Sequence, residues 1–217
     1  MELALQLLLA YLLGCVMGGR VIGALRGGVD LRRLGSGNIG ATNALRTQGA
    51  AFALGVLLID VLKGVVAVLV VPQLVLPLEA TDWGGTYEAR AYACGAAVVI
   101  GHCYPVFNRF VGGKGVATLA GVVACLLPQA AVWMLGGFVL VVMLSGYVSL
   151  ATLCAAVLGL FQVSCVGPQG LLSPAGLFLL GMNGLLFWKH RHNLLRLYRG
   201  TESRFERARV LGRWLRR

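Results

Sequence analysis

Residues 35–46, GSGNIGATNALR, gather polar groups between two long apolar runs. The glycines let the backbone turn sharply and approach a ligand closely. Neutral hydrogen-bonding groups and one guanidinium accompany them, on Ser36, Asn38, Thr42, Asn43 and Arg46. A helix after such a turn directs free N–H groups at an anion. The sequence therefore predicts a phosphate-binding loop, with Gly37 also in contact with the ligand. A plain loop between helices is the alternative.

A second glycine-rich segment ends in Gly112-Gly113-Lys114-Gly115. Backbone amides of such a turn can cradle a phosphate while the lysine reaches it. The alternative is a lysine that only sets membrane orientation at a helix end. Earlier in the same segment, His102 could orient a substrate hydroxyl or relay a proton, and a purely structural histidine is the other interpretation.

Two further groups of residues could carry chemistry. Asp60 and Lys63 lie three apart inside an apolar run, where ionisable groups are costly and usually face the protein interior. They either pair with each other, which would only hold helices together, or leave Lys63 facing a substrate anion. Near the C-terminus, His190 and Asn193 fall on one helix face and are candidate substrate contacts. A basic helix beside the membrane is the alternative there.

The composition of the chain in which these residues lie is typical of a membrane protein. The chain has 217 residues, of which 58% are hydrophobic and only 12% charged, whereas soluble domains carry roughly 25% charged residues. Apolar segments predict an all-α polytopic integral membrane protein; they cover about Ala4–Gly23, Ala50–Val71, Ala89–Ile100, Val116–Leu144, Tyr147–Val166 and Pro174–Trp188.

The basic segments predict the orientation. The loops at 20–46 and 109–114 and the tail at 189–217 are rich in Lys and Arg, so all three should be cytoplasmic. This requires a break of the 116–144 run at Pro128-Gln129. The prediction is about seven helices, some short, with an extracytoplasmic N-terminus and a cytoplasmic C-terminus. The alternative is a single long helix at 116–144, which gives six spans and places the basic tail outside.

The chain is expected to be a single membrane-embedded domain over residues 1–217, with 189–217 including the basic tail. The acidic segment 72–88, which contains Trp83, is expected to be an extracytoplasmic loop. Beside a membrane span, a basic tail favours anionic lipid over nucleic acid, which we do not expect as a partner. The six cysteines form no CxxC pair, no metal motif is present, and we expect no cofactor. The N-terminus does not resemble a signal peptide, and there is no G-x-S-x-G motif of a serine hydrolase.

Three motifs extend over nearly the whole chain: GSGNIGATNALRTQG, GHCYPVFNRFVGGKGVAT and HRHNLLRLYRGTE, with IDVLKG and YVSL between them. In this order and spacing they resemble the bacterial acyl-phosphate:glycerol-3-phosphate acyltransferases, the PlsY family. The resemblance adds Ser149, Arg191 and Glu202 as substrate-binding residues. One departure is Val111, where the family usually has lysine, so Arg109 and Lys114 supply the charge of that loop.

The resemblance implies transfer of a fatty acyl group from acyl-phosphate to the 1-hydroxyl of glycerol 3-phosphate. It assigns catalytic roles to Ser36, Arg46, Lys114, His190 and Asn193. The departing phosphate could take the hydroxyl proton, with His190 as the fallback base. The expected location is the bacterial inner membrane, with the site facing the cytoplasm. The expected partners are the two substrates, membrane lipid and the enzyme that makes acyl-phosphate. A transporter or channel for a phosphorylated anion, or a regulatory membrane protein with a lipid-binding tail, are the competing classes.

Overall fold

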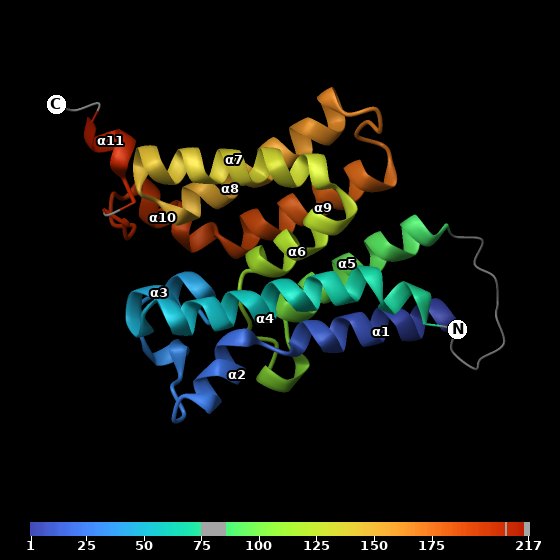
Figure 1. Cartoon of the computed structure of the whole chain (residues 1–217), viewed down its shortest axis with the longest axis horizontal. Helices are drawn as coiled ribbons and strands as arrows, with labels where there is room; N and C mark the ends of the chain where they lie inside the picture. Colours follow the sequence, from blue (N-terminus) through green and yellow to red (C-terminus); the bar gives the residue numbers. More distant parts are fainter. Residues whose placement is uncertain (75–85, 207, 215–217) are drawn as a thin grey trace. The chain divides into compact units, whose positions relative to one another are not determined.

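The computed structural model describes residues 1–74, 86–206 and 208–214, and this part of the chain is helical without a β-strand (Figure 1). The helices form two compact units, Met1–Leu126 and Leu127–Arg217. The single membrane-embedded domain over residues 1–217 stays a prediction. Trp83 and most of the expected extracytoplasmic loop at 72–88 lie outside the described residues.

The first unit is built around three helices that lie side by side, α1, α4 and α5 (Figure 1). Its α-helices are α1 (Glu2–Cys15), α2 (Gly18–Leu25), α3 (Ala41–Gln48), α4 (Ala50–Leu69), α5 (Tyr87–Cys103) and α6 (Val116–Leu126). Short 3-10 turns are η1 (Leu31–Arg33), η2 (Val71–Gln73) and η3 (Val106–Asn108). Gly14 and Gly101 allow the close contact of α1 with α5, because a Cβ on either would overlap a carbonyl oxygen of the facing helix.

The first apolar segment differs from the expected single run over Ala4–Gly23. It forms α1 and α2, which are bent by 45° relative to each other. Val16 and Met17 between them are extended, with ψ angles of 107° and 119°. A break of this kind frees backbone polar groups, which inside a bilayer must find partners within the protein.

The ion pair of α4 supplies those partners. The N–H of Gly18 donates to Oδ1 of Asp60 at 3.1 Å. The ammonium of Lys63 donates to the carbonyl oxygens of Gly14, at 3.0 Å, and Val16, at 2.7 Å. The helix break and the buried charges of α4 are therefore one structural feature, which periodicity in the first segment alone cannot reveal.

The outer face of α4 is apolar. Leu54, Leu58 and Leu62 follow one another at four-residue spacing and are 55%, 50% and 55% exposed, whereas Asp60 and Lys63 are buried. Exposed leucines and buried charges are typical of a helix in lipid. In the described part of the chain, three helices are long and apolar enough to cross a membrane: α4 with η2, α7 (Pro128–Ser145), and α8 (Val148–Phe161) with the π turn η4 (Gln162–Val166) that follows it. The bent α1–α2 pair raises that number to four.

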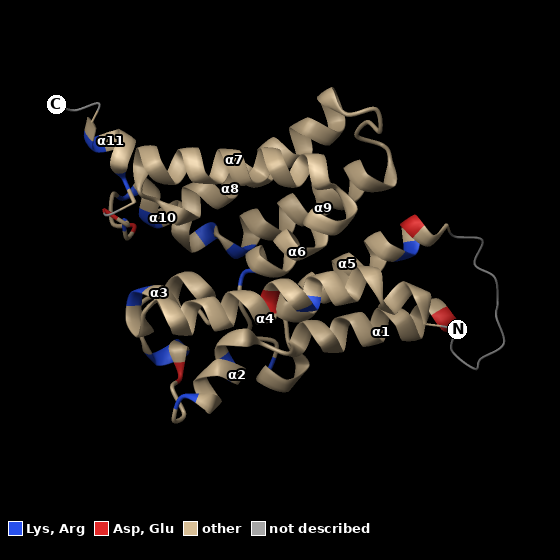
Figure 2. Cartoon of the chain, in the orientation of Figure 1, with Lys and Arg blue, Asp and Glu red and all other residues tan. Residues whose placement is uncertain are grey.

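The second unit consists of α7 (Pro128–Ser145), α8 (Val148–Phe161), a π turn η4 (Gln162–Val166), α9 (Pro174–Lys189), α10 (Arg191–Tyr198) and α11 (Val210–Trp214). The start of α7 at Pro128 confirms the predicted break in the 116–144 run, so the single long helix is wrong. Within this unit α8 packs against both α7 and α9. Figure 2 shows these three helices free of charged residues along most of their length.

The basic tail is folded onto the second unit. The N–H of Phe205 donates to the carbonyl oxygen of Gly146 at 2.8 Å. The guanidinium of Arg204 lies 4.5 Å from the centre of the Tyr147 ring, and α11 contacts α7. The segment that follows α10 therefore packs against the turn between α7 and α8.

Candidate active site

The first glycine-rich loop is organised by the buried carboxamide of Asn43, which is 1% exposed. Its Nδ2 donates to the carbonyl oxygens of Leu31, Leu34 and Asn38, at 3.1, 2.9 and 2.8 Å. Its Oδ1 accepts the N–H of Ser36 at 3.0 Å. The carboxamide thus gives the loop its shape, and direct contact of Asn43 with a ligand stays a prediction.

The other predicted residues of this loop are more accessible. Ser36, Gly37 and Arg46 are exposed, and Asn38 and Thr42 are half-buried. Gly40 precedes α3 in extended backbone, so the helix begins directly after the loop, as expected. Ser36 and Arg46 thus lie at the surface of the first unit, and their contact with a phosphate stays a prediction.

The second glycine-rich loop lies against His102. The N–H of Gly113 donates to the carbonyl oxygen of His102 at 3.1 Å. A Cβ at Gly113 would overlap Nε2 of the imidazole, so only glycine fits there. Gly112 is similarly close to the carbonyl oxygen of His102. Lys114, which follows, is half-buried, and Gly115 has a φ of 81°.

Asn108 links the second glycine-rich segment to α2 and η1, a role that the sequence did not reveal. Its Oδ1 accepts hydrogen bonds from Arg32 Nη1 at 3.1 Å and from Arg20 Nη1 at 3.4 Å. Its Nδ2 donates to the carbonyl oxygen of Val111. The only signal in the sequence is a carboxamide beside Arg109 in a basic loop.

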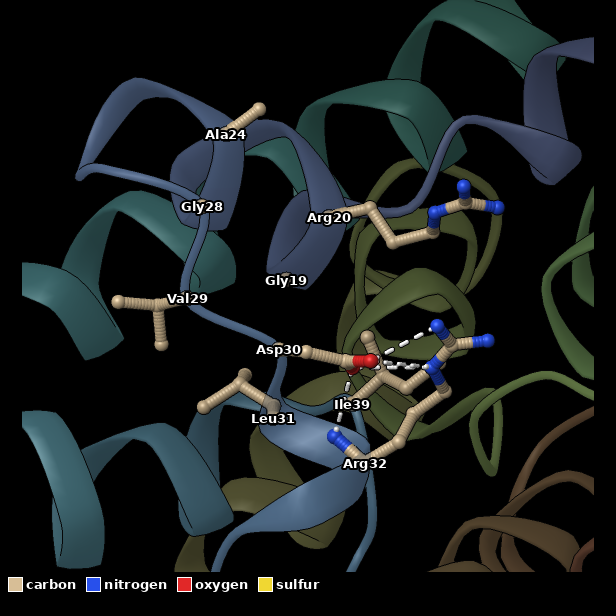
Figure 3. Close-up of a pocket in the computed structure, with 9 residues that line it drawn as sticks. All are labelled: Gly19, Arg20, Ala24, Gly28, Val29, Asp30, Leu31, Arg32 and Ile39. Atoms are coloured by element: carbon tan, nitrogen blue, oxygen red, sulfur yellow. Dashed lines mark hydrogen bonds and ion pairs between the residues drawn. The ribbon is translucent and has the colours of Figure 1, made fainter.

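A pocket of about 200 Å³ opens beside these arginines in the first unit (Figure 3). Its lining residues are Gly19, Arg20, Ala24, Gly28, Val29, Asp30, Leu31, Arg32 and Ile39. Arg32 donates to both carboxylate oxygens of Asp30, from Nε to Oδ1 at 2.9 Å and from Nη2 to Oδ2 at 2.8 Å. These hydrogen bonds lower the pKa of Asp30 to about 2, so the pocket combines two cations with one permanent anion at neutral pH.

A buried polar cluster lies behind the second loop. Lys63 Nζ is 2.9 Å from Oδ1 of Asp60 and 2.8 Å from Nδ1 of His102. Oγ1 of Thr118 lies 3.3 Å from the same Nδ1. Asp60 and Lys63 pair with each other, and contact of Lys63 or His102 with a substrate stays a prediction.

In the second unit, Glu202 joins Asn193 and Arg196 of the third motif to Ser149 of the YVSL segment. Its Oε1 accepts from Oγ of Ser149 at 2.8 Å and from Nδ2 of Asn193 at 2.7 Å. Its Oε2 accepts from Nε of Arg196 at 2.7 Å. Burial opposes ionisation of this carboxyl, but the three hydrogen bonds and the charge of Arg196 outweigh it and lower the pKa of Glu202.

Two more residues of that motif are placed by local contacts. His190 joins the end of α9 to the start of α10, is 2% exposed, and has Nδ1 2.8 Å from the carbonyl oxygen of Leu186. Arg191 donates from Nη1 to the carbonyl oxygen of Trp188 at 2.8 Å, with its guanidinium 4.4 Å from the centre of the indole ring. The structure thus brings Ser149, Asn193 and Glu202 into one network, with His190 at the preceding helix junction.

Among residues 1–74, 86–206 and 208–214, no three His, Cys, Asp or Glu side chains are grouped closely enough to hold a metal ion. All six cysteines, which lie within these ranges, are free thiols.

The fold and these loops define an all-α integral membrane protein whose glycine-rich segments carry cations and carboxamides. Residues 4–200 match the family model described as "Glycerol-3-phosphate acyltransferase", so the chain belongs to this family. A relative from Thermus thermophilus with the same name is 44% identical over 205 residues, which cover 93% of this chain and 95% of the relative. A relative from Halalkalibacterium halodurans, also so named, is 41% identical over 211 residues, 95% and 98% of the two chains.

Two solved structures are similar along almost the entire chain. The crystal structure of PlsY (YgiH), an integral membrane glycerol 3-phosphate acyltransferase, in its glycerol 3-phosphate form is 33% identical, with a TM-score of 0.80. The lysophosphatidic acid form of the same protein is 32% identical, with a TM-score of 0.79. Each match covers 97% of this chain and 99% of the other. The family predicted from the three motifs is confirmed.

Proposed function

We propose that the protein transfers a fatty acyl group from acyl-phosphate to the 1-hydroxyl of glycerol 3-phosphate. The observation that carries this proposal is the similarity, over 97% of the chain, to a membrane acyltransferase crystallised with glycerol 3-phosphate. An ester C–O bond forms as the acyl–phosphate C–O bond breaks, and the products are lysophosphatidic acid and inorganic phosphate. The donor is already an activated anhydride, so no covalent enzyme intermediate is required.

The cations and amides of the loops suit this chemistry, since both substrates carry phosphate. In the proposal, the first loop binds one phosphate through Ser36, Asn38, Thr42 and Arg46. Lys114 and the amides of residues 112–115 bind the other and stabilise the developing oxyanion. The departing phosphate takes the proton of the hydroxyl group. His190 and Asn193 position glycerol 3-phosphate, and Ser149, Arg191 and Glu202 support them.

The proposal includes an orientation in the membrane. Seven membrane-embedded helices, with the N-terminus outside and the basic tail at 189–217 inside, place the basic loops in the cytoplasm. The protein then lies in the bacterial inner membrane, where the acyl chain of the donor enters from lipid and glycerol 3-phosphate enters from the cytoplasm. The enzyme that makes acyl-phosphate is its expected neighbour in metabolism.

The test uses the purified full-length protein in lipid, supplied with palmitoyl-phosphate and glycerol 3-phosphate, and follows phosphate release. Release should depend on glycerol 3-phosphate and should fall at least about 100-fold in Lys114→Ala and in Arg46→Ala, because each removes a charge that binds phosphate. Arg26→Ala is the matched control: Arg26 is an exposed arginine of the same unit and should retain wild-type activity.

A folded wild-type protein that releases no phosphate above a protein-free blank would contradict the proposal. Uptake of radiolabelled glycerol 3-phosphate into proteoliposomes would then test the transporter interpretation.

A further inference from the structure

Asp60, Lys63 and His102 form a deeply buried cluster of ionisable side chains in the first unit. Their side chains are 2%, 3% and 5% exposed. They come from two helices, α4 and α5, and Thr118 of α6 completes the group. The cluster lies between the bend of the first span and the second glycine-rich loop, so it contacts both.

The hydrogen bonds of Lys63 determine which nitrogen of His102 carries a proton. An ammonium group has three hydrogens and no acceptor. Four acceptors surround Nζ within 3.0 Å: the carbonyl oxygens of Gly14 and Val16, Oδ1 of Asp60 and Nδ1 of His102. The shortest contact of Nδ1 is with Lys63, at 2.8 Å, whereas Oγ1 of Thr118 lies at 3.3 Å and Oδ1 of Asp60 at 3.5 Å. Because Lys63 can only donate, this contact favours Nδ1 as the acceptor and a ring hydrogen on Nε2, with one of the two carbonyl oxygens or Oδ1 of Asp60 sharing a hydrogen.

The charge of the cluster agrees with this assignment. Ionised Asp60 and Lys63 cancel each other, so a neutral imidazole leaves the buried group without net charge. A doubly protonated His102 would direct an N–H at the ammonium of Lys63 at 2.8 Å and add an uncompensated buried charge.

The protonated edge of the ring faces the loop that holds Lys114. A Cβ at Gly113 would overlap Nε2, and Gly113 also donates its N–H to the carbonyl oxygen of His102. The ring therefore contacts Lys63 through Nδ1 and lies against the glycine loop at its Nε2 edge.

We propose that Asp60 and Lys63 hold His102 as the neutral Nε2–H tautomer, so that His102 presents a fixed hydrogen-bond donor to the Gly112–Gly115 loop and is not a proton acceptor in the reaction. His102 is a positioning residue for the loop, and Asp60 and Lys63 position His102. The tautomer can be tested whatever reaction the protein catalyses, whereas the expected effect on kcat rests on the proposed function.

The tautomer is measured directly by ¹⁵N NMR of histidine-labelled protein in lipid. The chain has three histidines, and His102→Gln identifies the signals of His102. We expect a protonated Nε2 and an unprotonated Nδ1 in the wild type. Lys63→Met should lose the single tautomer, because the donor to Nδ1 is gone. A proton on Nδ1 in the wild-type protein, alone or with one on Nε2, would overturn the proposal.

The kinetic test compares two replacements of the ring. Glutamine keeps an N–H group near the position of Nε2, while leucine keeps the bulk and removes the donor. His102→Gln should stay within about 10-fold of wild-type kcat, and His102→Leu should lose a further factor of about 10 or more, as expected for a lost fixed donor. His192→Gln, at an exposed histidine of α10, should behave as wild type.

A proton acceptor at position 102 would give a different pattern, in which both variants lose about 10²–10⁴-fold in kcat. Equal losses in His102→Gln and His102→Leu, with an active wild type, would therefore refute the role given to His102. An inactive wild type would instead refute the proposed function, while the NMR result would still decide the tautomer.

Discussion

Glu202 is the residue on which the third motif depends for its shape. Its carboxylate accepts three side-chain hydrogen bonds, two of them from residues predicted to contact substrate, Ser149 and Asn193. A substitution here acts on Ser149 and Asn193 together, so loss of activity in a Glu202 variant does not by itself show contact with substrate.

We predict that Glu202→Gln lowers the free energy of unfolding by about 1–3 kcal/mol. The amide nitrogen of glutamine cannot accept a hydrogen bond, so at least one of the three donors loses its acceptor. Thermal unfolding in detergent would measure this loss. Glu206→Gln is the matched control, since Glu206 is exposed and lies four residues further on. A Glu202→Gln protein as stable as the control would show that the network contributes little.

The carboxyl of Glu202 also makes the stability of the protein depend on pH. Its folded-state pKa lies below its ordinary value of 4.5. The stability that it contributes is therefore complete above pH 4.5 and is lost as the pH falls through the lower, folded-state pKa. Below pH 4.5 the wild-type protein should lose more stability than Glu202→Gln does, as measured by unfolding at a series of pH values. Parallel curves for the two proteins would contradict this.

At the scale of the element, the bend between α1 and α2 depends on a helix that follows much later in the chain. Lys63→Met would leave Asp60 uncompensated and the carbonyl oxygens of Gly14 and Val16 without their ammonium donor. We predict a loss of about 3–5 kcal/mol in unfolding free energy, measured in lipid or detergent. Leu62→Met, on the exposed face of α4, should change it by less than about 1 kcal/mol.

A double variant separates the two contributions of Lys63. Asp60→Asn with Lys63→Met removes both charges, so it should recover the part of the loss that comes from an unpaired carboxylate. The part due to the two carbonyl oxygens should remain. A Lys63→Met protein as stable as Leu62→Met would refute the coupling of the bend to α4.

The sequence predicted the helices better than it predicted their contacts. The length and apolar character of residues 50–71 and 174–188 were enough to predict α4 and α9, and Pro128 marked the start of α7. The break at Val16 and Met17 was not visible, because its partners lie more than 40 residues away in α4. A local pattern shows that a residue is polar, but not which distant backbone groups it will satisfy.

The same limit applies to the candidate site. Glycine and charge spacing selected the loops, yet could not tell a ligand contact from a residue that shapes the loop, as Asn43 shows. The role of Asn108 could not be predicted, because its partners, Arg20 and Arg32, belong to other segments.

At the scale of the whole molecule, the charge distribution predicts the orientation. Ten of the nineteen Lys and Arg residues lie between Lys189 and Arg217, and such a basic segment favours the cytoplasmic side. A reporter fused after Arg217 should therefore be active only in the cytoplasm of the bacterial host. A fusion before Met1 should report the opposite side, and a periplasmic signal from the C-terminal fusion would contradict the seven-helix orientation.

The bend of the first span has a consequence for biosynthesis. The donors and acceptors that complete it, on Asp60 and Lys63, are translated 42 to 49 residues after the groups that they satisfy. Unsatisfied backbone groups are costly in hydrocarbon, so the nascent chain cannot settle into its final bend while only α1 and α2 have left the ribosome. The first span therefore reaches its final form only after α4 has been made, and a truncation that ends before Asp60 should leave an N-terminal segment that inserts but does not acquire the native break.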